Sequence, residues 1–255
     1  MAQSNIEWTE ITWNPTTGCT KLSDGCVFCY AQPLSLRLKA MGIEKYRNGF
    51  KLTIHPQELN KPYFWKKPKL VFVNSMSDLF YHEVPDDFIK SVFKVMNETP
   101  QHNYQLLTKR SERVLQIADQ LNWSENIWMG VSVENESVIK RIEDLINTPA
   151  SIKFISCEPL IGPIHSLEKY IDRLDWIIVG GESGPGARPI EKNWVDVIKE
   201  VCQKHHVPFF FKQWGKKKFN INIYDPTINT SHPVHAKGGC QLDGKVYREM
   251  PVLQV

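Results

Sequence analysis

Seven short apolar segments recur along this 255-residue chain, and they constrain its fold more than any other feature. Each has the length and the continuous hydrophobic character of a buried β-strand. They lie at residues 11–13, 69–74, 104–107, 127–133, 152–156, 176–179 and 207–211. Four segments between them carry apolar residues on one helical face, within residues 88–96, 114–121, 138–146 and 194–201. Fully apolar strands and one-faced helices are typical of a parallel sheet covered by helices.

The sequence therefore predicts an α/β fold, a partial (β/α) barrel of about six to seven parallel strands with flanking helices and a C-terminal cap. A doubly wound sheet is the alternative, because periodicity does not distinguish the two. No linker rich in Gly, Ser or Pro divides residues 1–219, which we expect to form the barrel. Residues 220–255 show little helical or strand period, and residues 238–244 indicate turns. We expect this segment to be a C-terminal extension that packs on the barrel.

Three cysteines, Cys19, Cys26 and Cys29, stand close together just after the first predicted strand. Three thiolates leave one position of a tetrahedral site open, and they suit a [4Fe–4S] cluster whose fourth iron is left for a small molecule. The alternative is zinc, with a fourth ligand supplied through the fold by one of three histidines, His55, His82 or His102. A disulfide framework is disfavoured, because the other cysteines are scattered and no secretory signal is evident.

Composition excludes some classes and leaves others open. No apolar run approaches the roughly 20 residues of a membrane span, so we expect a cytoplasmic protein with no membrane partner. The net charge of +3 gives no strong field for nucleic acid. Two lysine clusters, at residues 66–69 and 216–218, are either solvated faces or phosphate sites. The sequence does not indicate an oligomeric state.

Polar residues follow each apolar segment, at the strand ends where (β/α) barrels build their sites. The candidates are Ser75, Asp78, Lys109, Ser132, Glu134, Cys157, Glu158, Gly180, Gly181 and Glu182. Some have a structural alternative: Glu158 could pair with Arg188, and the glycines could serve loop packing as well as close approach to a ligand. Seven segments that agree on one polar rim favour an enzyme.

The segment from Cys26 to Ala31, Cys-Val-Phe-Cys-Tyr-Ala, resembles the end of the radical S-adenosylmethionine (radical SAM) signature. The family usually has three residues between its first two cysteines, whereas six separate Cys19 from Cys26 here. The order of strand-end residues is most similar to the spore photoproduct lyase-like branch. That resemblance implies SAM contacts for Ser75, Lys109 and Ser132. The Gly-Gly-Glu motif of other members is absent after the second strand, where Asp78 could instead meet the SAM amino group.

Nearly the whole chain also resembles a phage- and prophage-associated family with three cysteines. The residues that carry this resemblance lie at 13–19, 26–31, 74–78, 157–160, 180–184, 211–215 and 242–244.

The radical SAM resemblance implies reductive cleavage of SAM to a 5′-deoxyadenosyl radical, with flavodoxin or ferredoxin as the reductant. Lys109 would neutralise the SAM carboxylate, and Glu134 or Glu158 would hold ribose hydroxyls. Cofactor contacts are also expected from Gly180, Gly181 and Glu182. Tyr30 would pack beside the cluster, and Cys157 would return a hydrogen atom to a product radical.

The expected substrate is a nucleic-acid base or nucleotide that is repaired or modified, or another small molecule. The lysine clusters and eight tryptophans agree with nucleic acid. Two other functions stay open. One is a non-catalytic phage protein that binds nucleic acid and whose cysteine loop is stabilised by zinc or a cluster, and the other is a redox sensor.

Overall fold

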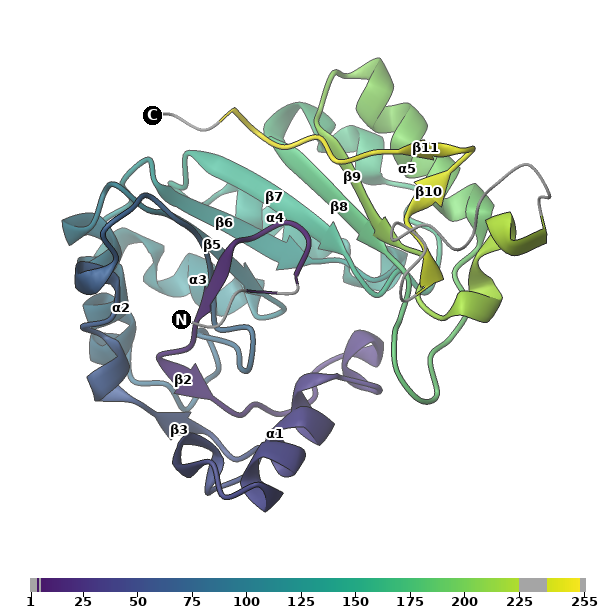
Figure 1. The fold of residues 1–255 in the computed structure, drawn as a ribbon. Helices are drawn as coiled ribbons and strands as arrows, with labels where there is room; N and C mark the ends of the chain where they lie inside the picture. Colours follow the sequence, from purple (N-terminus) through teal and green to yellow (C-terminus); the bar gives the residue numbers. More distant parts are fainter. Residues whose placement is uncertain (1–3, 5, 225–237, 253–255) are drawn as a thin grey trace. The chain divides into compact units, whose positions relative to one another are not determined.

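The computed structural model describes residue 4, residues 6–224 and residues 238–252 (Figure 1). Its main sheet has the strand order β1-β4-β5-β6-β7-β8-β9. All seven predicted strands are present, as β1 (Ile11–Trp13), β4 (Leu70–Val73), β5 (Asn103–Thr108), β6 (Ile127–Ser132), β7 (Ile152–Cys157), β8 (Trp176–Gly180) and β9 (Phe209–Gln213).

The strand order confirms the predicted fold class. The pairs β1 with β4, β4 with β5, β5 with β6, β7 with β8 and β8 with β9 are parallel. The strands follow one another in chain order without the reversal that marks a doubly wound sheet. Helices alternate with them, as expected for right-handed crossovers. β1 and β9 are the two edges, so the sheet is a partial (β/α) barrel.

The chain forms two compact units. The first comprises residues 1–22, 29–131 and 144–153. Its helices are α1 (Ala31–Ala40), α2 (Asp86–Glu98), α3 (Ser111–Ile117) and the 3-10 helices η2 (Glu44–Tyr46), η3 (Pro56–Glu58), η4 (Pro62–Phe64) and η5 (Ala118–Gln120). A short antiparallel pair, β2 (Thr16–Thr17) and β3 (Thr53–Ile54), adjoins them in sequence. α2 has Pro85 before its first turn and buries Ile89, Val92 and Phe93, which explains its predicted one-faced pattern.

The second unit comprises residues 23–28, 132–143 and 154–255. It holds β8, β9, most of β7, and α5 (Lys192–Lys204), while α4 (Lys140–Ile146) runs across the boundary. Its 3-10 helices are η1 (Asp24–Cys26), η6 (Glu136–Val138), η7 (Leu167–Lys169), η8 (Ile171–Arg173), η9 (Lys217–Phe219) and η10 (Ile221–Tyr224). Aromatic side chains fill its core, including Phe154, Trp176 and Phe210, each at most 1% exposed.

A turn lies within residues 238–244, as predicted, but it joins two short strands that were not predicted. β10 (Gln241–Leu242) pairs with β11 (Lys245–Val246) in a hairpin. Its two central residues, Asp243 and Gly244, have φ angles of 51° and 72°. Asp-Gly is a preferred pair for such a two-residue turn, because both positions need a positive φ. The strands are too short for a visible alternation of apolar and polar residues.

The described part of the C-terminal segment contacts the second unit's strands. The indole of Trp214 donates a hydrogen bond to the Gln241 carbonyl at 2.8 Å, and that of Trp176 donates to the Glu249 carbonyl at 2.9 Å. The boundary predicted at residue 219 stays a prediction, since residues 225–237 and 253–255 lie outside the described residues. Of the helices in the described ranges, none combines the length and hydrophobicity needed to cross a bilayer.

Candidate functional site

The three N-terminal cysteines lie on a loop between β2 and α1. Cys19 comes two residues after β2, Cys26 ends η1, and Cys29 stands two residues before α1. All three are partly exposed and none forms a disulfide. The thiol of Cys19 donates a hydrogen bond to the Thr20 carbonyl at 3.3 Å and also interacts with the Arg110 guanidinium. The loop therefore keeps three thiols outside the hydrophobic core, where a cluster or metal can reach them.

The donor set fits an iron–sulfur cluster in kind and number, because three thiols outside any disulfide occupy one loop. Within the described ranges, no three His, Cys, Asp or Glu side chains come together as ligands of one ion. Two of the histidines considered for zinc are engaged elsewhere: His55 contacts the Thr17 hydroxyl at 2.8 Å, and His102 contacts the Pro62 carbonyl at 3.2 Å.

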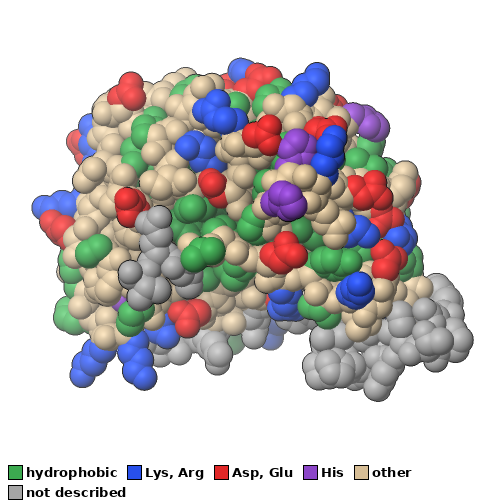
Figure 2. Space-filling model, turned by 90° about the horizontal axis from the view of Figure 1, so that it is seen from above, with side chains coloured by type: hydrophobic (Ala, Val, Ile, Leu, Met, Phe, Trp, Pro, Cys, Tyr) green, Lys and Arg blue, Asp and Glu red, His purple; other side chains and the backbone are tan. Residues whose placement is uncertain are grey.

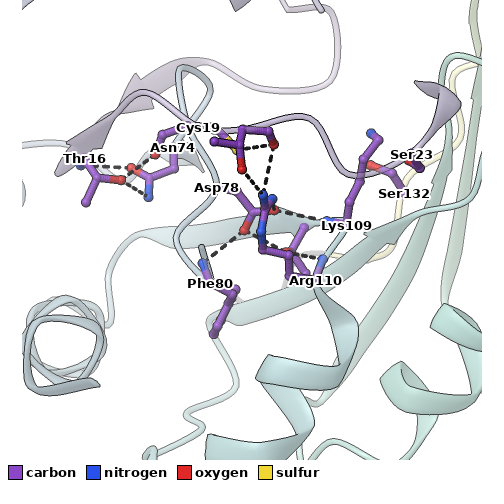
Figure 3. A network of polar contacts seen from close by, with 12 residues as sticks. Thr16, Cys19, Ser23, Asn74, Asp78, Phe80, Lys109, Arg110 and Ser132 are labelled. Atoms are coloured by element: carbon purple, nitrogen blue, oxygen red, sulfur yellow. Dashed lines mark hydrogen bonds and ion pairs between the residues drawn. The ribbon is translucent and has the colours of Figure 1, made fainter. Parts of the chain in front are cut away.

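Asp78 organises the strand ends of the first unit (Figure 3). One carboxylate oxygen accepts hydrogen bonds from the Phe80 amide at 3.0 Å and the Thr108 hydroxyl at 2.7 Å. The other accepts from the Lys109 amide at 3.2 Å and the Arg110 guanidinium at 3.0 Å. Asp78 is 7% exposed. Its hydrogen bonds join the loop after β4 to the end of β5. Its predicted contact with the SAM amino group stays a prediction.

Arg110 connects this network to the cysteine loop. Its guanidinium donates to the Thr20 carbonyl at 3.0 Å, and it lies over the Tyr81 ring, 4.8 Å from the centroid. Burial lowers the pKa of Arg110, but the Asp78 carboxylate and the Cys19 thiol outweigh that effect and raise it. Arg110 was not among the residues predicted for the site. Its position beside Lys109 at a strand end was the available signal.

Tyr30 and Ser75, both predicted for the site, lie together in the first unit. The Tyr30 hydroxyl donates to the Ser75 carbonyl at 2.6 Å. The Ser75 hydroxyl and the Met76 amide both donate to the side-chain oxygen of Asn14, at 3.2 and 3.0 Å. Asn14, which follows β1 directly, therefore fixes the loop after β4. Asn14 lies within the motif at residues 13–19, but only the fold shows its contacts with the loop after β4.

Glu134 holds the cysteine loop in the second unit. Its carboxylate accepts from the Ser23 hydroxyl, from the Gly25 amide at 3.3 Å and from Arg141 at 2.7 Å. Arg141 also donates to the carbonyl of Ser132 at 2.8 Å. Glu134 is 1% exposed and Ser132 is 3% exposed. The carboxylate thus has a structural role next to η1, and ribose binding by Glu134 stays a prediction.

Arg188 makes a second attachment to the same loop. It binds Glu182 in a two-point contact, with distances of 2.9 and 2.6 Å, and its guanidinium also donates to the Asp24 carbonyl at 2.8 Å. The hydrogen bond with Glu182 raises the pKa of Arg188. The guanidinium lies 5.5 Å from the centre of the Phe28 ring.

The predicted pairing of Glu158 with Arg188 is therefore wrong. Glu158 instead pairs with Lys212, at 2.6 Å, across the end of β8. Gly180 lies between them in the strand order, and a Cβ there would meet the Glu158 side chain at 3.3 Å. A Cβ on Gly181 would lie 2.4 Å from the Trp214 carbonyl oxygen, so close backbone packing explains this glycine. Cofactor contacts by Gly180, Gly181 and Glu182 stay predictions.

Two further predicted residues differ in exposure. Cys157 is completely buried, and burial raises the pKa of its thiol, with smaller contributions from Cys202 and Glu134. It is a neutral thiol in the core, and hydrogen donation by it stays untested. Lys109 is partly exposed at the end of β5, where its amide binds Asp78.

A family model described as "Protein of unknown function (DUF5131)" matches residues 3–251. The chain belongs to this family. A comparison with curated proteins finds no match.

Similar solved structures include three of spore photoproduct lyase, each 13% identical. One is complexed with dinucleoside spore photoproduct, with a TM-score of 0.49 over 80% of this chain and 63% of the lyase chain. A mutant with bound AdoMet and the same dinucleoside gives 0.44 over 77% and 62%. Another mutant gives 0.48 over 81% and 64%. The chain spans less than two thirds of the length of each lyase chain.

Proposed function

We propose that this protein is a radical SAM enzyme, in which Cys19, Cys26 and Cys29 hold a [4Fe–4S] cluster, and that it acts on a nucleic-acid base or nucleotide. The observation that carries the proposal is the state of the three thiols. They are outside any disulfide, partly exposed and confined to one loop at the start of a parallel (β/α) sheet. Three thiolates are the ligand set that leaves one iron of such a cluster open.

When bound, a reduced cluster of this type supplies the electron that cleaves SAM to methionine and a 5′-deoxyadenosyl radical. The chain's own residues position the loop and the cofactor. In the first unit, Arg110 places a positive charge beside Cys19, which favours an anionic thiolate ligand. In the second unit, Glu134 and Arg188 hold the residues just before Cys26.

The exposure of the side chains distinguishes among some of the residues proposed to contact SAM. Lys109 would bind the SAM carboxylate, since it is partly exposed at a strand end. Glu158 is a better candidate for a ribose hydroxyl than Glu134, because its side chain is 20% exposed while that of Glu134 is 1% exposed. Ser75 and Ser132 would contribute hydroxyl contacts, and Tyr30, which is 52% exposed, would lie beside the cluster.

The test is anaerobic purification and reconstitution, followed by iron and sulfide counts and a dithionite assay for 5′-deoxyadenosine. About four irons with sulfide, and a product that disappears in Cys26→Ala, are expected. Cys240→Ala is the matched control, because Cys240 is buried whereas the three loop thiols are partly exposed. One zinc without SAM cleavage would overturn the proposal in favour of a zinc-stapled binding protein. A cluster that never cleaves SAM would instead indicate a redox sensor.

A further inference from the structure

A cavity of about 460 Å³ lies against β1 in the first unit. Its walls include Thr12 of β1 and five residues of the segment that follows α1, which are Lys45, Glu58, Lys61, Phe64 and Trp65. The volume is within the range of small-molecule sites, which is roughly 300–1,000 Å³. Asn14, which follows β1 directly, also lines this cavity, whereas none of the residues proposed to contact SAM does.

The cavity is positively charged, because two lysines share a single carboxylate. Lys45 and Lys61 lie 2.9 and 2.8 Å from the two oxygens of Glu58. Burial lowers the pKa of Lys45 even though Glu58 opposes the shift. Burial would raise the pKa of Glu58, but the hydrogen bonds from Lys61 and Lys45 lower it. A bound anion would therefore stabilise the two lysines and Glu58 together. Lys61 is the lysine that can reach such an anion, because its side chain is 56% exposed.

An exposed aromatic ring stands beside these charges. Phe64 is 77% exposed, while the neighbouring Trp65 is 8% exposed and forms part of the wall. Leaving a phenylalanine in water costs hydrophobic free energy that burial would recover. An accessible aromatic face next to an accessible lysine is the combination that binds a base and its phosphate in single-stranded nucleic acid.

The cavity also adjoins the strand-end network. Lys45 donates to the Asn14 carbonyl at 2.8 Å, and the Asn14 side chain accepts from Ser75. β1 is an edge strand, so it has a hydrogen-bonded neighbour in the main sheet on one side only. Such an edge can offer backbone donors and acceptors to a ligand.

We propose that this cavity binds one nucleotide of a single-stranded nucleic acid, with the base stacked on Phe64 and the phosphate bound by Lys61. The inference deepens the proposed function and rests on it for the choice of nucleic acid. On the face drawn in Figure 2, Lys and Arg side chains are interspersed with Asp and Glu. The net charge of the whole chain is only +3, so specific contacts, rather than a broad positive field, must supply the affinity.

The experiment measures fluorescence anisotropy of a labelled oligothymidylate of about 12 nucleotides with the full-length protein, without cluster or SAM. Phe64→Ala should weaken binding about tenfold through the lost stacking. Lys61→Gln should weaken it several-fold and reduce the slope of log K against log salt by about 0.7. Both side chains are exposed, so neither change should disturb folding.

Two variants on α1 and α2 of the same unit serve as controls. Leu36→Ala removes an apolar side chain that is 52% exposed, and Lys94→Gln removes an exposed lysine that, like Lys61, faces a glutamate. Both should bind within about twofold of the unchanged protein. A duplex of the same length should bind more weakly, because its bases are already stacked.

The inference is overturned if the oligonucleotide does not bind at low salt, or if Phe64→Ala and Lys61→Gln bind as the controls do. This outcome is distinguishable from failure of the proposed function, because binding is measured without cluster or SAM. Binding that depends on Phe64, in a protein that forms no 5′-deoxyadenosine, would keep the cavity's assignment and remove the radical chemistry. If the protein forms 5′-deoxyadenosine but its binding of the oligonucleotide does not depend on Phe64, the proposed enzyme activity stands and the assignment of the cavity is wrong.

Discussion

The six cysteines fall into two sets with opposite surroundings. Cys19, Cys26 and Cys29 are partly exposed on a loop. The other three, Cys157, Cys202 and Cys240, are buried, at 0%, 0% and 4% exposure. A buried free cysteine acts as a small hydrophobic side chain, whereas an accessible one is retained for its chemistry. The contrast teaches that only the first set is available for ligation.

The two sets are also held differently. Polar contacts fix the loop around the first set: Arg110 to Thr20 in the first unit, and Glu134 and Arg188 to residues 23–25 in the second. Each such hydrogen bond is worth about 1 kcal/mol net, because it replaces one with water. Close packing fixes the second set. Loop variants should therefore change ligation, and core variants should change stability.

The largest expected effect is on ligation. Cys29→Ser should abolish cluster binding and lower 5′-deoxyadenosine formation by at least about 100-fold, since a cluster with two thiolates is not held. The thermal midpoint of the metal-free protein should stay nearly unchanged, because the side chain is partly exposed. Iron counts and a melting curve measure both. A variant that retains full iron content would break the distinction between the two sets.

Asp78→Ala should have the next largest effect. It leaves Arg110, whose side chain is 11% exposed, without its carboxylate, and removing one member of such a pair costs roughly 3 kcal/mol. Urea unfolding measures the loss. The matched control is Asp86→Ala. Asp86 pairs with Arg113, but its side chain is 47% exposed, so its loss should lower the free energy of unfolding by less than about 1 kcal/mol. Equal costs would show that Asp78 does not organise this region.

Cys202→Ala should destabilise the protein by about 1–2 kcal/mol, since it removes one heavy atom from a fully buried position. Iron content and SAM cleavage should be unaffected. Cys26→Ala, measured in the same unfolding experiment, should cost less than about 0.5 kcal/mol. If Cys26→Ala destabilised the protein more than Cys202→Ala, the division into accessible cysteines and buried core cysteines would be contradicted.

The smallest effect concerns pH. Burial lowers the pKa of His55 below its ordinary value of 6.5. The unfolded chain therefore binds a proton at His55 more readily than the folded chain does. As a result, the stabilisation that neutral His55 gives to the folded state is fully present above about pH 6.5 and is lost as the pH falls below that value. His55→Gln should flatten the pH dependence of the unfolding free energy between pH 7 and 5.5. His82→Gln, with a side chain that is 69% exposed, is the control.

Some elements were predictable because their signals are local. The strands β4 and β8 are continuous apolar runs, and α2 and α5 bury one face each. α1 was missed because it buries only Ala31 and Ser35, while Leu34 and Leu36 are exposed, so its apolar residues mark no buried face. β9 begins two residues later than the predicted segment, at Phe209, because Pro208 cannot donate to the ladder.

The sequence by itself determined the seven strands, their alternation with helices, and the loop that carries three cysteines. Periodicity and spacing act over a few residues, so they can be read without the fold. Only the tertiary structure decided that Arg188 binds Glu182 and that Lys212 binds Glu158. It alone also brought Lys45, Glu58 and Lys61 together against β1. The reason is that hydrogen bonds and ion pairs depend on separation in space, which strand order and loop packing set.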